Sequence, residues 1–429
     1  MQKVALVTRS SLAEWRSCRT ITANLLGSYL AAPHLDRQVF RLPEGETNYD
    51  IWQLAQKISS WQPDQIVFID HQPCPGGLIQ ALARVWNQGP LPRLLVHIFG
   101  DFVLQCAEWL QSEPALKQFS ILWICASTRQ KRLVEQMLVD PRGTVTVVPF
   151  PVDVSHFRYA AEVRERGRKH FGLAGDAFVF FYSGRLSSQK NVIQLIQAFQ
   201  GLRQLTERKL VLALAGPVDD LGSPYFGKIH PEGLMSYRLQ DVIRSSLVDS
   251  VEYWGNLAAE ELLLAYTAAD LFVSLSTHND EDYGMAPAEA FATGCPGVLT
   301  DWGGYSDFHD LLPESCSLIP TDFAAPEIFN LNRVRKALFA GFLNASTSRR
   351  QDKSAQAAAV LSCEAVAQKL TELLSHPERV VFQGWNENFK KVVYSFNVKP
   401  WAPFSGKEGP SDLYRKLYSV YATGEYDAN

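Results

Sequence analysis

The chain has 429 residues, more than one hydrophobic core ordinarily organises, so two or three compact domains are expected. Hydrophobic residues make up 46% and charged residues 20% of the sequence, which argues against a wholly disordered or fibrous protein. The formal net charge of −4 gives no overall attraction to nucleic acid or to anionic lipid, so nucleic acid is not an expected partner.

The cysteines and the first apolar run bear on the compartment. Seven cysteines are scattered without a Cys-x-x-Cys pair, which predicts reduced thiols, mostly buried, in a cytoplasmic protein. The first apolar run ends at Thr8 and Arg9, far short of the roughly 20 residues of a membrane span, and is interpreted as a β-strand. No other run approaches that length, so membrane contact is expected to be at most peripheral, at the inner membrane face.

The N-terminal part alternates short apolar runs with helix-length amphipathic segments. Strands are predicted at residues 3–9, 65–70, 93–99, 121–127 and 144–150, and helices at 20–31, 48–61, 76–86 and 127–138. This alternation predicts a parallel sheet covered by helices on both faces.

A charged segment at residues 150–173 interrupts this rhythm, which then resumes. Strands are predicted at 178–184, 209–216, 251–255, 270–276 and 296–301, with helices between them at 191–205, 260–269 and 287–294. The chain is therefore predicted to be α/β, with two Rossmann-like, doubly wound parallel-sheet domains that face a central cleft. The predicted domains are residues 1–160, residues 161–384 and a terminal segment at 385–429. Ligands of such sheets bind outside the carboxyl ends of the strands, so the cleft is the expected site.

Two cations bracket the predicted turn between the strand at 178–184 and the following helix. Gly184 permits a tight turn, and Arg185 and Lys190 offer a planar fork and a point charge, a combination that suits a diphosphate. Taken alone, the stretch also fits two solvated surface cations with Asn191 as the helix N-cap.

A short helix is predicted after the strand at 270–276. Pro287 suits its first residue and Gly294 suits the C′ position beyond its end. The backbone N–H groups of residues 284–286 would point out of its N-terminus and could receive phosphate or sugar oxygens. Glu281 lies in the preceding loop, and Glu289 is predicted in the first helical turn.

Each of these acidic residues has a simpler interpretation. Glu289 could only complement the helix dipole, which is worth about 0.3–1 kcal/mol. Glu281 stands between Asp280 and Asp282, so this run also fits a solvated acidic loop, or an Asp-x-Asp motif of the kind that binds a divalent metal ion in a single-sheet fold. The two glutamates could also be the carboxyl pair of a glycoside hydrolase, although the cation-bearing turn would then have no use.

Together the two stretches resemble the retaining GT-B glycosyltransferases of family four, the group 1 glycosyl transferases similar to glycogen synthase and sucrose synthase. The signature of that family is Glu-x7-Glu after a strand, here Glu281 and Glu289. The runs at 145–157, 251–276 and 297–307 are also similar to the family, so the resemblance covers residues 144–310.

The resemblance implies transfer of a hexose-type sugar, with retention and without a metal or other cofactor, from a nucleotide-diphosphate sugar to a hydroxyl acceptor. The acceptor would be a glycan, a lipid or a small molecule. Arg185 and Lys190 would bind the diphosphate, Glu289 the ribose and Glu281 the transferred sugar. The other implied donor-binding residues are Gly184, Gly216, Tyr283, Gly284, Met285 and Ala286.

On the acceptor side, similar enzymes place a histidine at the end of a strand. The corresponding residue here is His97, counted with Glu281, Arg185 and Lys190 among the implied catalytic residues, and Asp101 lies in the adjoining loop. The glycine-rich loop that commonly follows the first strand of the family is absent. Either other side chains replace its contacts or acceptor recognition differs; the candidates are Arg9, Ser10 and Arg16.

Several alternatives stay open at this point. The main one is a sugar-nucleotide-binding protein without catalysis, and a GT-B epimerase or phosphorylase is a minor one. The cations at 164–169 are interpreted as a solvated helix face rather than a membrane contact, because glutamates are interleaved with them. A helix at 411–422 is predicted to return to the first domain. Trp302 and Tyr305 either line the cleft or pack ordinarily.

Overall fold

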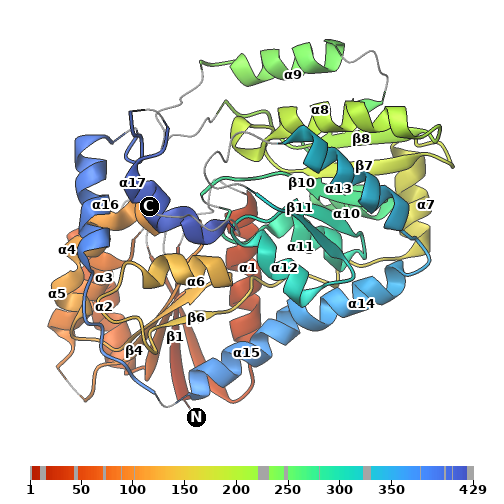
Figure 1. Cartoon of the computed structure of the whole chain (residues 1–429). Helices are drawn as coiled ribbons and strands as arrows, with labels where there is room; N and C mark the ends of the chain where they lie inside the picture. The colour runs from red at the N-terminus through yellow and green to blue at the C-terminus, as the bar shows by residue number, and fades with distance from the viewer. Residues whose placement is uncertain are drawn as a thin grey trace. The chain divides into compact units, whose positions relative to one another are not determined.

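The structure, a computed structural model, divides into two compact units: Met1–Pro151 with Cys363–Pro403 (unit 1), and Val152–Ser362 with Phe404–Asn429 (unit 2) (Figure 1). It describes residues 2–9, 16–42, 47–70, 74–87, 89–100, 102–220, 231–245, 250–279, 281–321, 330–376, 378–400, 402–407 and 409–422. Among these residues, every helix is too short or too polar to cross a membrane.

Unit 1 is built on a six-stranded parallel sheet in the order β2-β1-β3-β4-β5-β6. Its central strands are continuous apolar runs, as expected where helices cover both faces of a sheet. The strands are β1 (Gln2–Arg9), β2 (Leu35–Leu42), β3 (Gln65–Phe68), β4 (Arg93–His97), β5 (Ile121–Cys125) and β6 (Val145–Val147).

The helices of unit 1 come from both ends of the chain. The N-terminal ones are α1 (Arg16–Ala31), α2 (Asn48–Trp61), α3 (Gly76–Val85), η1 (Phe102–Gln105), α4 (Cys106–Gln111), α5 (Glu113–Leu116) and α6 (Thr128–Glu135). The C-terminal ones are α15 (Cys363–Ser375) and α16 (Glu387–Val398). Helix α2 begins where a capping box forms, because Thr47 Oγ1 accepts from the Asp50 N–H and the Asp50 carboxylate accepts from the Thr47 N–H.

Unit 2 is built on a second six-stranded parallel sheet, in the order β12-β11-β10-β7-β8-β9. Its strands are β7 (Phe178–Ser183), β8 (Leu210–Ala215), β9 (Val251–Tyr253), β10 (Leu271–Ser274), β11 (Gly297–Thr300) and β12 (Cys316–Ile319). Its helices are α7 (Ala161–His170), η2 (Ser188–Lys190), α8 (Val192–Leu202), η3 (Arg203–Leu205), α9 (Leu234–Ser245), α10 (Ala259–Ala268), α11 (Met285–Ala292), α12 (Tyr305–Leu311), α13 (Leu331–Asn344), α14 (Arg350–Leu361), α17 (Asp412–Tyr418) and η5 (Ser419–Tyr421). Helices α8, α9 and α13 contribute side chains to one apolar core together with strands of this sheet.

The C-terminal part of the chain is divided between the units differently from the predicted domains. Residues 363–384 belong to unit 1, where the side-chain amides of Gln2 and Gln65 donate to Leu374 O at 3.1 and 2.7 Å. Beyond them, Trp385 lies 5.4 Å from the Trp123 ring of β5.

The terminal helix α17, predicted to return to the first domain, belongs to unit 2. There the Gly303 N–H donates to Tyr421 O at 2.9 Å, and the Trp302 and Tyr421 rings lie 6.0 Å apart. The first boundary falls after Pro151, nine residues before the predicted end of the N-terminal domain at residue 160.

Two of the cations predicted on a solvated helix face are directed inward. Arg164 donates to Asp270 and to three carbonyls that end α10, and Arg168 lies 3.5 Å from the same carboxylate. Asp270 also accepts from the Val179 N–H at 2.9 Å. The prediction is wrong for Arg164 and Arg168, because exposed carbonyls at a helix C-terminus attract cations whatever the charge pattern of α7. Arg166 remains exposed.

Arg350 completes this cluster from α14. The residue is 1% exposed. The guanidinium carbon lies over the Tyr159 ring, 5.3 Å from the ring centroid. It donates to carbonyl oxygens where α10 and α11 end, namely those of Tyr266, Thr267, Ala269 and Thr293. Arg350 shares the Thr267 and Ala269 oxygens with Arg164, and it also links the end of α10 to that of α11.

We expect Arg350→Met to destabilise unit 2 by about 3 kcal/mol, because the buried carbonyl oxygens that the guanidinium bonds would each lose a donor. Hydrogen–deuterium exchange should show faster exchange of the amides in α10 and α11. Arg349→Met is the matched control, since that side chain is 53% exposed and pairs with Glu314 at the surface. Equal exchange in the two variants would contradict the assigned role of Arg350.

Candidate functional site

The carboxyl ends of β7, β8 and β10 lie side by side, because β7 stands between β10 and β8 in the parallel sheet of unit 2. The segments that follow these strands are residues 184–191, 216–220 and 275–284. They carry most of the predicted donor-binding residues.

The segments after β7 and β8 approach each other through two glycines. A Cβ atom on Gly216 would lie 2.0 Å from Gly184 O, and Gly216 has φ of +131°, so a larger residue fits neither the space nor the backbone. Gly184 donates to Ala215 O at 3.0 Å, and Gly216 donates to Gly255 O at 2.8 Å. Gly216 is thus needed where the backbone after β8 passes close to the backbone after β7. Its predicted role of admitting a nucleotide stays a prediction.

Lys190 lies at the end of η2, and its Nζ forms a hydrogen-bonded ion pair with Glu281 Oε2. Asn191, which follows it with φ of +54°, donates through Nδ2 to Leu275 O at 2.7 Å and to Thr277 Oγ1 at 2.9 Å. The Asn191 side chain therefore does not cap α8. It ties the start of α8 to the segment after β10, and this places Lys190 beside Glu281.

Arg185 pairs with a residue that the sequence analysis missed. Its Nη1 lies 2.7 Å from Asp219 Oδ2, and its carbonyl oxygen accepts from the Tyr182 hydroxyl at 2.8 Å. Asp219 stands three residues beyond Gly216, in the loop that follows the strand beside β7. That position next to a predicted strand end is the signal that could have identified it.

Glu281 is held by the Gly-Gly turn after β11. The Gly304 N–H donates to Glu281 O at 2.8 Å, and a Cβ on Gly303 would lie 2.1 Å from the same oxygen. The Tyr305 hydroxyl lies 2.8 Å from Ser274 Oγ. Burial raises the pKa of Tyr305 well above its usual value, and the charge of the nearby Glu281 carboxylate raises it further. Tyr305 is therefore a neutral hydroxyl beside Glu281.

Trp302 and Tyr305 are packing residues rather than exposed stacking surfaces. Trp302 is fully buried and donates through Nε1 to His278 O at 2.7 Å, and Tyr305 is 3% exposed. The Tyr305 ring also occupies the space above Gly284, where a Cβ would lie 2.5 Å from it. Of the two interpretations left open by the sequence, ordinary packing is the one the structure supports.

Helix α11 begins two residues earlier than predicted. Gly284, with φ of +108°, precedes its first residue, Met285, so Pro287 occupies the third position. Glu289 then lies in the second turn and not in the first, and its Oε2 accepts from the Tyr266 hydroxyl of α10 at 3.0 Å. A simple helix-dipole role for Glu289 is therefore disfavoured. Gly294 occupies the C′ position as predicted, with φ of +69°.

The remaining predicted residues of this segment differ in exposure. Tyr283 is buried, with its ring 5.1 Å from that of Phe308, and Met285 is also buried. Ala286 is half-buried at the second position of α11. Asp280 lies outside the described residues, so the Asp-x-Asp motif is not described as a whole. Among the described residues, His, Cys, Asp and Glu form no group of three or more arranged to hold a metal ion.

The acceptor-side candidates lie in unit 1. His97 ends β4 fully buried, with Nε2 2.7 Å from the Tyr29 hydroxyl. Burial lowers the pKa of His97 to about 3, so the imidazole is neutral at physiological pH. Arg9 Nη1 lies 3.9 Å from Asp70 Oδ2, and Arg16 is exposed at the start of α1. The other two candidates, Ser10 and Asp101, lie outside the described residues.

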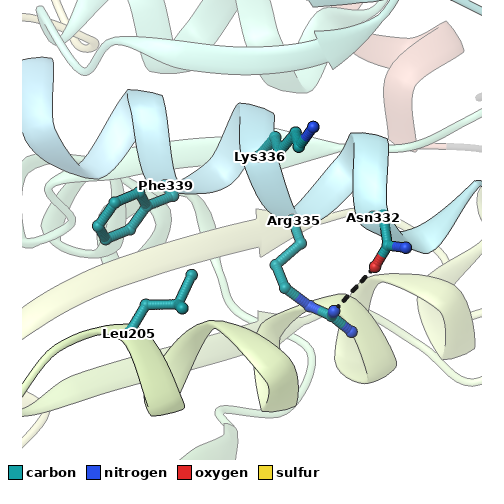
Figure 2. A pocket seen from close by; sticks show the side chains of 5 residues that line it. All are labelled: Leu205, Asn332, Arg335, Lys336 and Phe339. Atoms are coloured by element: carbon teal, nitrogen blue, oxygen red, sulfur yellow. Dashed lines mark hydrogen bonds between the residues drawn. The ribbon is translucent and has the colours of Figure 1, made fainter.

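A cavity of about 310 Å³ lies elsewhere in unit 2. Figure 2 shows its lining, which comes from η3 and α13 and consists of Leu205, Asn332, Arg335, Lys336 and Phe339. Arg335 Nη1 donates to Asn332 Oδ1 at 3.0 Å in this wall. The cavity adjoins the C-terminal end of α8, whereas Lys190 lies at the opposite end of that helix. None of the predicted site residues lines it.

Comparison with known proteins finds a family match within unit 2. Residues 163–310 match the family described as Glycosyl transferases group 1. This matching stretch, called here the group 1 segment, lies within unit 2. That segment contains Arg185, Lys190, Glu281 and Glu289, so the geometry above belongs to the part of the chain that matches.

Two curated relatives match parts of the chain. The lipopolysaccharide 1,2-N-acetylglucosaminetransferase of Salmonella typhimurium is 24% identical over 261 residues, which are 60% of this chain and 60% of the relative. The mannosylfructose-phosphate synthase of Agrobacterium fabrum is 34% identical over 166 residues, which are 38% of this chain and 34% of the relative. The chain thus spans less than two thirds of the length of either relative.

The fold has solved counterparts. The structure of Anabaena Alr3699/HepE in complex with UDP superimposes with a TM-score of 0.61 at 18% identity, covering 87% of this chain and all of that one. The two parallel sheets with flanking helices are those of GT-B glycosyltransferases, which confirms the predicted α/β fold class.

We expect Gly216→Ala to lower the free energy of unfolding by about 2 kcal/mol or more, because its Cβ would meet Gly184 O and its backbone conformation is unfavourable for alanine. The measurement is urea denaturation followed by circular dichroism. Gly175→Ala is the matched control, since a Cβ there meets nothing within 4 Å. A Gly216→Ala protein as stable as the control would show that the two strand ends can separate without cost.

Proposed function

We propose that the chain is a retaining glycosyltransferase that transfers a hexose-type sugar from a nucleotide-diphosphate sugar to a hydroxyl acceptor without a metal ion. The observation that carries this proposal is the pairing of Lys190 with Glu281 inside the group 1 segment. A cation suited to phosphate and a carboxylate suited to sugar hydroxyls meet at the carboxyl edge of one sheet, where ligands of such sheets bind.

The second cation strengthens the assignment. Arg185 lies five residues before Lys190, and together they offer a planar fork and an ammonium to a diphosphate. The N-terminus of α11, with the backbone N–H groups near Gly284, adds a third electropositive element that a phosphate oxygen can use. Glu289, held by Tyr266 in the second turn of the same helix, is proposed to bind the ribose.

The proposed reaction breaks the bond between the sugar C1 and the diphosphate oxygen and forms a bond from C1 to the acceptor oxygen on the same face. The acceptor proton passes to an oxygen of the leaving diphosphate. Negative charge develops on that group as the bond breaks, so preorganised cations at Arg185 and Lys190 would stabilise the transition state more than the ground state. Glu281 would orient the sugar through its hydroxyl groups.

A donor and product assay tests this function. The chain is incubated with UDP-, GDP- and ADP-sugars and a panel of glycan, lipid and small hydroxyl acceptors, with and without EDTA. We expect release of one nucleoside diphosphate, a product whose anomeric configuration by NMR equals that of the donor, and the same rate in EDTA. An inverted product would rule out retention, a rate restored only by manganese would rule out metal independence, and binding without turnover would indicate a non-catalytic binder.

For the same assay, we expect Arg185→Ala to lower kcat by about 100- to 1,000-fold, because the developing charge loses one preorganised donor. The urea midpoint of the variant should stay close to that of the wild type, since the ion pair that the variant loses is partly exposed and such pairs contribute little to stability. Lys336→Ala is the control, as it removes an exposed cation at the far end of α8. Similar rates for the two variants would remove Arg185 from the reaction.

A further inference from the structure

Both cations proposed to bind the diphosphate already contact carboxylates of their own chain. Arg185 pairs with Asp219, and the two side chains are 17% and 20% exposed. Lys190 pairs with Glu281, and those side chains are 15% and 9% exposed. A diphosphate that reaches either cation must therefore compete with a carboxylate that is already in place.

We propose that Asp219 is an internal counterion of the diphosphate site, which neutralises Arg185 in the unliganded protein and lowers the affinity for nucleoside diphosphates. This inference rests on the proposed function, because it takes Arg185 as a diphosphate ligand. Binding then exchanges the Arg185–Asp219 pair for an Arg185–phosphate pair. No covalent bond changes in this exchange.

The backbone keeps Asp219 close to the site during this exchange. The Asp219 N–H donates to Leu186 O at 3.1 Å, and the Leu186 N–H donates to Pro217 O at 2.8 Å. Leu186 also forms a parallel bridge with Val218. The segment after β8 is thus attached to the residue that follows Arg185. The Asp219 carboxylate can rotate away from the guanidinium, but its Cα stays beside it.

The consequence is repulsion between like charges. A carboxylate held near a bound diphosphate opposes binding in proportion to the local interaction between the two charges, which is stronger at a partly buried position than in water. Asp219 would also oppose retention of the nucleoside diphosphate product, which keeps the full phosphate charge after the sugar has left. It would therefore favour product release.

The two counterions are not equivalent. When Lys190 exchanges Glu281 for phosphate, the proposed function gives Glu281 new partners in the hydroxyl groups of the sugar, and its neighbour Tyr305 remains. The proposed function gives Asp219 no such new partner. Removing the charge of Asp219 should therefore tighten binding, whereas removing that of Glu281 should also damage sugar orientation.

The next residue supplies a matched control. The carboxylate of Asp220 accepts from the backbone N–H groups of Gly233 and Met235, at 2.6 and 2.7 Å, at the start of α9. Asp220→Asn removes the same charge one residue further along and keeps an oxygen acceptor for one of the two N–H groups, which bond different carboxylate oxygens. Comparing the two variants separates the effect of the Arg185–Asp219 contact from the effect of the negative charge of the loop as a whole.

The experiment is isothermal titration calorimetry of the full chain with UDP, GDP and ADP, and with inorganic pyrophosphate as a probe that lacks a base. We expect Asp219→Asn to bind the preferred nucleotide and pyrophosphate about fivefold more tightly than the wild type, and Asp220→Asn to stay within about twofold. In an Arg185→Ala background, Asp219→Asn should lose part of this gain, because competition for the guanidinium is then absent and only the repulsion between Asp219 and the phosphate remains.

Steady-state kinetics give a second readout that a merely structural role would not move. Asp219→Asn should lower KM for the donor and slow product release, so that kcat falls or stays level while KM falls. Asp219→Ser serves as a second variant should Asp219→Asn fold poorly. Binding that is unchanged or weaker in a folded Asp219 variant overturns the inference and leaves the proposed function standing. A wild-type chain that binds neither a nucleotide nor pyrophosphate overturns both.

Discussion

The buried guanidinium of Arg350 is the contact on which the arrangement of unit 2 depends. It donates to carbonyl oxygens at the ends of both α10 and α11, so one side chain fixes two helices that approach it from different parts of the chain. Helix α10 carries Tyr266 and helix α11 carries Glu289. The hydrogen bond from the Tyr266 hydroxyl to the Glu289 carboxylate is a second link between the two helices, nearer the candidate site. A residue that contacts neither cation of the site thereby determines where Glu289 lies.

The strand order explains the pairing of charges. Because β7 stands between β8 and β10, the turn after β7 has one neighbouring segment on each side. Arg185 meets Asp219 on the β8 side, and Lys190 meets Glu281 on the β10 side. Each cation therefore has its own carboxylate, supplied by a different loop. A parallel sheet produces this arrangement directly, since the carboxyl ends of neighbouring strands lie at the same edge.

The sequence predicted the features that local pattern determines. Apolar runs between amphipathic segments gave both sheets, and strand-to-helix turns located Arg185, Lys190 and Glu281. Arg350 was missed because its partners are distant in sequence: it bonds residues 57 to 84 positions away, and hydrophobic periodicity carries no information about such contacts. Asp219 was missed although its place after a predicted strand end marked it. The terminal segment, predicted as one piece, is divided between the two units after Pro403. Aromatic residues near the C-terminus indicate packing, but the sequence alone does not say which of two similar sheets receives them.

The return of α15 and α16 to unit 1 has a consequence for how the chain is made and divided. Unit 1 is discontinuous, since it needs residues 363–403 in addition to its first 151. During translation, the sheet of unit 1 would emerge from the ribosome long before α15 and α16, which pack against α1 and near Trp123 of β5. Most of unit 2 would be synthesised in between. A fragment that stops at residue 160 would leave this apolar surface uncovered. The smallest autonomous form of the N-terminal half is therefore not a contiguous piece of the gene.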